Sequence, residues 1–450
     1  MRNLKLLTII TLLLLTTSCK KNYVYNDTPT NDTFIANSTI RSYDEALQIA
    51  EKALIILDGN HTRSEKKRTI KRDKGQIIYH SITRNDDDCN NPVMYIFNNE
   101  DNEGFTIVSA DRSQQALIAV TQKGSYTFGT PTGVEPFDLY IENVTSQLMS
   151  SFEPATLPDQ PLIPIPGYKI DTADYNYSKV DAMLTTKWGQ SGIYGDLCPN
   201  GLSGCTNTAA VQIMAYHKQP YNLPITYLGA NSYTLSIDWD NILLHTTGSG
   251  RKDSTLDKYV CNCGCNYDQI SIIMREIGSR ANTEYEFDNP NTPENERGSR
   301  ADELAIRNVL YDLGFGNPVH VEGIVLEDYK NVIFENLNKN RPIYVSGFQV
   351  DNTGHAWVID GYEHTSFRVD YYKADPNYNN INEEPVYTYD FSSNIETNLL
   401  HFNWGWNGDC DGWFTYGCFD TKKGVDYDNG SDENFNFINW INLVYNIQPN

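Results

Sequence analysis

Five prolines between residues 154 and 166 separate this chain of 450 residues into two parts. Proline donates no backbone hydrogen bond and fixes its own φ, so this stretch continues neither a helix nor a central strand. We therefore expect an exposed linker at residues 154–170, where a protease has access. The chain is longer than a domain with one ordinary hydrophobic core, which predicts about two domains, here residues 38–153 and 171–450.

The N-terminus has the pattern of an export signal. Basic residues precede an apolar run at residues 6–15, which is too short to cross a bilayer. Small residues then lead directly into Cys19, as in the lipobox of bacterial lipoproteins. We expect residues 1–19 to be a signal peptide, Cys19 to be lipidated and the polar residues 20–37 to form a tether. The alternative is an ordinary secretory signal with an incidental cysteine, because Thr16 replaces the usual aliphatic residue.

The charge of the chain limits its partners. The 58 acidic residues outnumber the 35 basic ones and give a formal net charge of −23. This charge repels phosphate backbones and argues against nucleic acid as a partner. We expect membrane contact only through a lipid anchor, in an envelope lipoprotein that is periplasmic or at the surface, or else secretion after processing.

Export places the other eight cysteines where disulfides can form. Cys261, Cys263 and Cys265 lack the two-residue gap of a zinc knuckle and have no nearby histidine, so we expect disulfides or free thiols there and no metal. Cys410 and Cys418 stand on either side of strand-like residues, and a disulfide between the two cysteines could join the ends of that segment. The spacing does not give the connectivity.

Residues 38–153 predict a small α+β domain. Apolar residues between Ser42 and Leu57 share one helical face, and Ser42 is a possible N-cap. Four strand-like runs follow this helix, at residues 76–81, 93–97, 104–109 and 117–121.

Cys205 directly precedes a helix of small residues in the second part of the chain. A thiolate at a helix N-terminus is stabilised by the helix dipole and by unpaired backbone N–H groups, which lower its pKa. Cys205 is therefore a candidate nucleophile, although a buried structural cysteine has the same local pattern. A nucleophile of this kind requires a base.

The candidate base is His355, which follows a glycine turn and begins a strongly apolar strand. Rigid placement at the edge of a cleft suits an ion pair with a thiolate. His217 lies three turns along the Cys205 helix and cannot reach the thiol. Other histidines stand among polar or unpatterned neighbours, which indicates the surface; these are His61, His80, His245, His364 and His401.

Three further side chains complete a plausible site. The amide oxygen of Asn403 can accept the second ring N–H of His355 and fix its tautomer, and the indole of Trp404 can shield that bond. Core packing is the alternative for Trp404. The amide of Gln190 can join the Cys205 N–H in an oxyanion hole.

These motifs resemble, in order, those of the streptopain family of papain-like cysteine peptidases. The resemblance rests on Trp188–Gln190, Gly204–Cys205, Gly354–Ala356 and Asn403–Trp406. It implies an α+β papain-like fold, with helix packed on an antiparallel sheet. It also implies catalytic Cys205 and His355, an oxyanion-hole Gln190, and Trp404 and Asn403 beside the histidine.

The first domain resembles the propeptide of this family at Tyr95–Phe97 and Gly104–Asp111. The resemblance implies an intramolecular inhibitor, polypeptide substrates and a thiol mechanism that requires no metal or organic cofactor. Two departures from the family pattern are Thr206–Asn207 after the nucleophile, which could cap the helix, and a polar insertion at residues 367–397. We expect this insertion to form a surface loop, which could fold over the cleft.

Two other functions remain open from the sequence. One is a catalytically silent papain-like lipoprotein that binds a peptide or a host protein, and the other is a cell-wall peptide hydrolase. The joint presence of Cys205, His355, Gln190 and Asn403 argues against binding alone. The acidic charge gives no affinity for anionic wall polymers.

Overall fold

The computed structural model describes residues 40–57, 68–79, 92–112, 114–150, 168–229, 232–247, 250–251, 258–260, 266–287, 298–348, 354–374, 386–415 and 440–450. Helices and antiparallel strands make up these residues, so the predicted α+β class is confirmed. Within them, no helix combines the length and the apolar character needed to cross a membrane.

In the described residues of the N-terminal domain, two α-helices, two short 3₁₀ helices and four strands are present. Helix α1 begins after Ser42, whose Oγ accepts a hydrogen bond from the Glu45 N–H at 3.3 Å, so the predicted cap is confirmed. The four predicted strands are present where the structure describes them. The elements are α1 (Tyr43–Leu57), η1 (Arg72–Lys74), β1 (Gln76–Tyr79), β2 (Pro92–Asn98), η2 (Glu100–Asn102), β3 (Phe105–Ser109), β4 (Leu117–Thr121) and α2 (Glu135–Ser150).

The second part of the chain supplies helices and the longer strands. The helices are η3 (Gly192–Tyr194), α3 (Cys205–His217), α4 (Trp239–His245), α5 (Gln269–Arg280), α6 (Glu303–Asp312), η6 (Leu326–Tyr329) and α7 (Lys330–Asn338). The long sheet contains β5 (Tyr168–Val180), β14 (Val319–Ile324), β15 (Ile343–Phe348), β16 (Gly354–Ala374), β17 (Tyr387–Asn403), β18 (Gly412–Thr415) and β19 (Trp440–Tyr445). Short hairpins are formed by β6 (Asn222–Ile225), β7 (Tyr233–Ser236), β8 (Thr246–Thr247), β9 (Gly250–Arg251), β10 (Lys258–Val260), β11 (Asn266–Asp268), β12 (Glu284–Phe287) and β13 (Gly298–Arg300).

One antiparallel sheet runs through both parts of the chain. Its order is β1-β2-β3-β4-β18-β17-β16-β15-β19-β14, and β5 pairs with β16 outside this path. The junction lies between β4 and β18, where Gly412 pairs with Thr121 and Phe414 with Ala119. The N-terminal domain therefore extends the sheet of the second part instead of standing apart from it.

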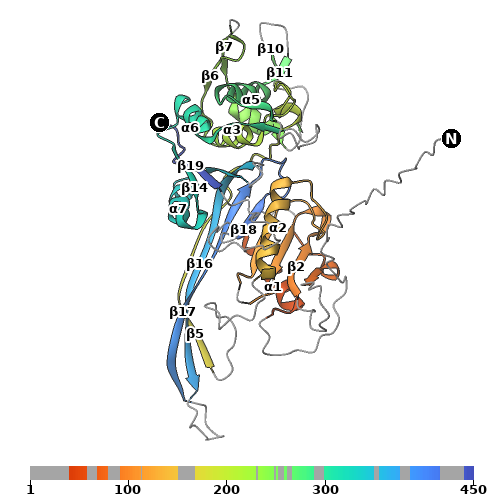
Figure 1. Ribbon diagram of the computed structural model, residues 1–450, viewed down its shortest axis with the longest axis vertical. Coiled ribbons are helices and arrows are strands. Elements are labelled where there is room, and N and C mark those ends of the chain that lie inside the picture. The colour runs from red at the N-terminus through yellow and green to blue at the C-terminus, as the bar shows by residue number, and fades with distance from the viewer. Residues whose placement is uncertain are drawn as a thin grey trace, which may run out of the picture.

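Helices cover both faces of this sheet (Figure 1). On one face, α2 and α7 share a single core with Trp357, Trp404 and Phe414. On the other face, α1 packs near Trp413, and α3, α5 and α6 form a separate core around Ala356 and Val358. Because successive strand residues point to opposite faces, β16 and β18 each contribute to both sides.

Strands β5, β16 and β17 continue as a long arm that leads away from α3 (Figure 1). The expectation of a surface loop at residues 367–397 is therefore wrong for the described residues, which form paired strands up to Ala374 and from Tyr387. Phe367, Val369, Tyr371 and Ile395 pack together on this arm. Alternating apolar residues outweigh the polar composition there. Of the expected linker, residues 168–170 belong to β5, and the remainder lies outside the described residues.

Candidate active site

Cys205 is the first residue of α3, and Gly204 makes this position possible. The φ angle of Gly204 is +87°, and a Cβ at this position would lie 2.8 Å from the backbone oxygen of Ser299. Only glycine satisfies both conditions without strain. The chain therefore turns sharply into the helix, and Cys205 stays partly exposed while the following residues 206–215 are buried.

Burial and neighbouring polar groups act in opposite directions on the Cys205 thiol. Burial raises the pKa of the thiol, while the backbone N–H groups of Ala356 and Thr206 and the Thr206 hydroxyl lower it; the carboxyl of Glu303 raises it. The N-cap position of α3 is Gly204, which has no side chain, and Thr206 and Asn207 lie inside the helix, so the expected capping by these two residues is not observed. The contact with Ala356 places the thiol beside the first residues of β16.

His355 is the second residue of β16 and is 7% exposed. Its Nε2 lies 2.7 Å from the carbonyl oxygen of Trp404. Because a carbonyl oxygen only accepts, Nε2 carries the proton and Nδ1 is the basic nitrogen of the neutral ring. The indoles of Trp357, Trp404 and Trp406 surround the ring at centroid distances of 6.5, 6.5 and 5.6 Å.

The environment of His355 favours the neutral imidazole. Burial lowers the pKa of His355 to about 4, and the Trp404 carbonyl and the charge of Glu135 oppose this shift. Glu135 is the first residue of α2, in the N-terminal domain. The N-terminal domain therefore lies close enough to the candidate base to act on it electrostatically.

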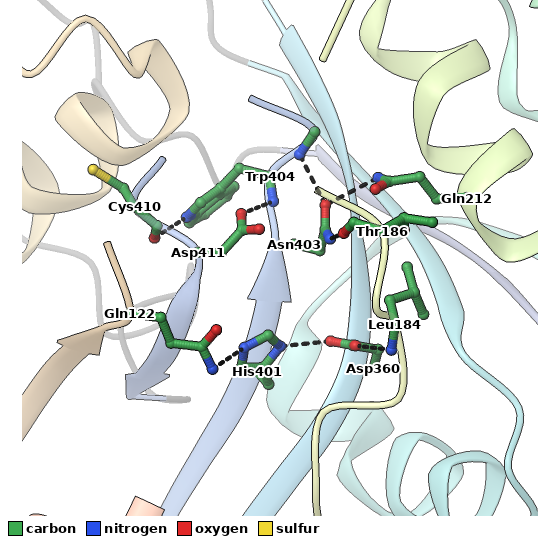
Figure 2. Close-up of polar contacts among 11 residues, drawn as sticks. Gln122, Leu184, Thr186, Gln212, Asp360, His401, Asn403, Trp404, Cys410 and Asp411 are labelled. Atoms are coloured by element: carbon green, nitrogen blue, oxygen red, sulfur yellow. Dashed lines mark hydrogen bonds and ion pairs between the residues drawn. The ribbon is translucent and has the colours of Figure 1, made fainter. Parts of the chain in front are cut away.

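Asn403 does not accept the His355 ring N–H, in contrast to the expectation from the sequence. Its Oδ1 accepts from Gln212 Nε2 at 2.9 Å and from the Gly405 N–H at 3.1 Å, and its Nδ2 donates to the Thr186 carbonyl at 2.8 Å (Figure 2). Asn403 pairs with Val358 on β16, so its side chain points to the sheet face opposite to that of His355. Instead, the backbone carbonyl of the neighbouring Trp404 accepts the hydrogen bond from the His355 ring.

Trp404 lies where the sequence places it, beside His355, and is fully buried. Its indole N–H donates to the Cys410 carbonyl at 3.1 Å (Figure 2). Its ring also packs against Phe402 and Phe414. Trp404 therefore lies beside His355 and also packs in the core, so the shielding and core-packing interpretations are compatible.

Gln190 lies next to the segment that enters α3. Its carbonyl oxygen accepts from the Ser203 N–H at 2.8 Å, two residues before Cys205. The preceding Gly189 is in close approach to Asn407, whose side-chain amide would collide with any Cβ at position 189. The Asn407 N–H donates to the Trp188 carbonyl at 3.1 Å. These contacts join the Gln190 segment both to α3 and to the loop after β17.

His401 is buried, so its expected surface position is wrong. Its Nδ1–H donates to Asp360 Oδ1 at 2.6 Å, and its Nε2 accepts from the Gln122 amide at 3.2 Å (Figure 2). Asp360 Oδ2 accepts from the Leu184 N–H at 2.7 Å. A histidine at an inward position of β17 with a carboxyl partner on β16 is visible only once the two strands are aligned.

The described cysteines other than Cys205 are buried free thiols, Cys198 and Cys410. Burial raises the pKa of both, to about 12 for Cys410. Cys261, Cys263 and Cys265, where we expect disulfides or free thiols, lie outside the described residues, as do Cys418 and Cys19. Within the described residues, Cys205 is thus the one cysteine that is partly exposed.

Two family models match this chain. The model of the peptidase C10 family matches residues 188–414, just over half of the chain, and the model described as Spi protease inhibitor matches residues 34–147. The two matches lie in the same order as the predicted propeptide and peptidase domains.

Similar proteins cover most of the chain. Streptopain from Streptococcus pyogenes is 24% identical over 351 residues, which are 71% of this chain and 73% of streptopain. The thiol protease/hemagglutinin PrtT of Porphyromonas gingivalis is 23% identical over 340 residues, 72% of this chain and 33% of that protein. The solved structure of a prointerpain A fragment from Prevotella intermedia has a TM-score of 0.46 and 21% identity, and the match covers 83% of this chain and 99% of that fragment.

The predicted resemblance to the streptopain family is confirmed by these matches. The second part of the chain carries the peptidase, and the first part carries the propeptide. The chain belongs to the peptidase C10 family and is a cysteine-type endopeptidase with a propeptide domain of the Spi protease inhibitor kind at its N-terminus.

Proposed function

We propose that the protein is an exported, lipid-anchored zymogen that hydrolyses polypeptides through a Cys205–His355 dyad. Two features support the dyad: the Ala356 N–H lowers the pKa of the Cys205 thiol, and His355, directly before Ala356, has its Nε2 at 2.7 Å from the Trp404 carbonyl oxygen. The nucleophile thus lies at the start of the strand that carries the base, and the basic nitrogen of that base is left for proton transfer.

The proposed reaction is acyl transfer to water. Nδ1 of His355 takes the proton of the Cys205 thiol, and the thiolate attacks the carbonyl carbon of the scissile peptide. The Cys205 N–H and the Gln190 amide stabilise the oxyanion, and His355 returns the proton to the leaving amine. Water, activated by His355, then hydrolyses the thioester and restores the thiol.

The proposed inhibition by the N-terminal domain has an electrostatic component. Burial raises the pKa of Cys205 and lowers that of His355, so both groups are neutral near pH 7 while the domain is in place. Phe137 and Tyr140 of α2 pack on Phe414, which contacts Trp404 beside the base. Removal of the domain exposes this region to water and favours the charged pair.

The dyad is tested with the chain from Lys20, incubated with reductant and casein. The parent is expected to shorten at the linker and to digest casein, while Cys205→Ala and His355→Ala do neither. Cys198→Ala, which removes a free thiol elsewhere, is the matched control and should behave like the parent. Casein digestion by Cys205→Ala, or cleavage of muropeptides without cleavage of casein, would contradict the proposal.

Lipid anchoring is supported by the sequence alone and has a separate test. Cells that express the full chain are grown with labelled palmitate, and the label and the membrane fraction are followed. The parent should take up label and sediment with membranes, and Cys19→Ala should do neither. A parent chain without label would show that Cys19 ends an ordinary secretory signal, and would leave the dyad unaffected.

A further inference from the structure

Asp411 closes a short loop that begins at Trp404, beside His355. The Trp404 N–H donates to Asp411 Oδ1 at 2.8 Å, and the Trp404 indole N–H donates to the neighbouring Cys410 carbonyl at 3.1 Å. Figure 2 shows both bonds at the end of β17. These two hydrogen bonds therefore connect the two ends of the loop at Trp404, the residue whose carbonyl contacts His355.

The carbonyl that contacts His355 belongs to the peptide between Trp404 and Gly405. Its oxygen accepts the His355 Nε2–H at 2.7 Å, and the Gly405 N–H of the same peptide donates to Asn403 Oδ1 at 3.1 Å. Gly405 has a φ angle of +70°, which favours glycine. Asn403 thus fixes the peptide after Trp404, and Asp411 fixes the peptide before it.

We propose that Asp411 is a positioning residue for His355 and acts through the Trp404 backbone. The proposal rests on the proposed Cys205–His355 dyad. With both adjoining peptides held, the Trp404 carbonyl cannot rotate away from Nε2, and the ring keeps the tautomer in which Nδ1 is basic. Neither Asn403 nor Asp411 touches the histidine, so neither is a catalytic residue.

The surroundings of Asp411 agree with this role. The side chain is 3% exposed, and an unpartnered carboxyl at that depth would be costly. Burial raises the pKa of Asp411 to about 7; the Trp404 N–H and the charge of Lys187 oppose this shift, and Asp360 adds to it. A carboxyl kept in the core at this cost indicates a function there.

The primary test is NMR of the histidine side chains in the full zymogen from Lys20, on a Cys205→Ala background that prevents processing. The His355 Nε2–H resonance is assigned by its loss in His355→Ala. We expect Asp411→Ala to lose this protected resonance and to mix the two tautomers. Asp411→Asn, which retains an acceptor oxygen, should keep it, and so should Asp409→Ala, a matched change in the same loop.

Kinetics supply the second readout, in chains with Cys205 intact. Turnover per alkylatable Cys205 is expected to fall about 100-fold in Asp411→Ala with KM unchanged, because the base is misplaced while the substrate-binding surface is intact. Asp411→Asn should recover most of this loss. If Asp411→Ala does not fold, Asp411→Leu removes the acceptor at similar volume.

The outcomes separate this inference from the proposed function. Loss of the resonance in the Ala or Leu variant and its retention in Asn support the positioning role, even if the parent digests no casein. An unchanged His355 resonance in a folded Ala or Leu variant overturns it, as does a folded Asn variant that loses the resonance. In each case, comparing casein digestion by the parent and by Cys205→Ala tests the dyad independently.

Discussion

The helical region and the N-terminal domain both pack on the central sheet, but they affect the site differently. Helices α3, α5 and α6 bury Ala356 and Val358 on one face and deliver Cys205. The N-terminal domain adds β4 to the edge of β18 and places α2 over the opposite face, toward Trp404. The proposed nucleophile thus comes from the helical region, whereas the surroundings of the proposed base depend on the N-terminal domain.

This difference indicates how inhibition works in the proposed zymogen. The N-terminal domain shares a strand pairing and an aromatic core with the peptidase, so its contact is not limited to the peptidase surface. Cleavage of the linker leaves these contacts in place, so the domain must also separate from β18 before the site opens.

The largest effect is expected from Gly412→Val. A Cβ at position 412 would overlap the backbone oxygen of Val120, across the β4–β18 junction. We expect the full chain to lose about 3 kcal/mol of stability or more and the alkylation rate of Cys205 to rise, because β4 is displaced. Denaturant unfolding and iodoacetamide labelling measure the two effects. In the processed peptidase, which lacks β4, an equal loss of stability would contradict this explanation.

A matched pair of core truncations compares the two regions directly. Phe137 of α2 and Ile273 of α5 are both fully buried, one in each region. Phe137→Ala and Ile273→Ala should each destabilise the full chain by about 2–5 kcal/mol. Only Phe137→Ala should increase the labelling of Cys205 below the unfolding transition. Equal labelling of the two variants would show that the N-terminal domain does not cover the site selectively.

The smallest effect is expected from the surface contact between the two parts. Lys123 and Asp409 form an ion pair at 2.6 Å, with side chains 48% and 42% exposed. Solvent screens such a pair, so Lys123→Ala should cost less than about 1 kcal/mol. Unfolding of the full chain at low and high salt measures this. A loss comparable to that of Phe137→Ala would mean that charge, not the shared core, holds the domain.

Local patterns in the sequence predict much of this molecule. Periodicity and capping chemistry predict α1 from Ser42 and strands β2 to β4, because these elements depend on neighbouring residues. The helix after Cys205 and the strand that carries His355 are predicted for the same reason. Family resemblance adds what the patterns alone cannot, namely the expectation that these two residues belong to one site.

The remaining features depend on contacts between distant segments. The sequence contains no signal that Ala119 pairs with Phe414, and without that pairing the domains look separate. The partner of Asn403 depends on its register with Val358, which directs it away from His355. His401 has polar neighbours in the sequence, yet Asp360 on the adjacent strand makes its burial possible. Register and long-range pairing are not encoded in short windows.

We propose that the N-terminal domain keeps Cys205 and His355 neutral and that its removal allows them to form an ion pair. The most direct test is the pH dependence of Cys205 alkylation in the full chain and in the processed peptidase. In the full chain, where burial raises the pKa of Cys205 and lowers that of His355, labelling should be slow at pH 7 and rise only at a pH above the ordinary pKa of a cysteine thiol.

After processing, the pKa of Cys205 should fall and that of His355 should rise, so labelling at pH 7 should be at least about tenfold faster. His355→Ala should abolish this increase, since the thiolate loses its partner. The same pH profile before and after processing, or an increase that persists in His355→Ala, would contradict the account.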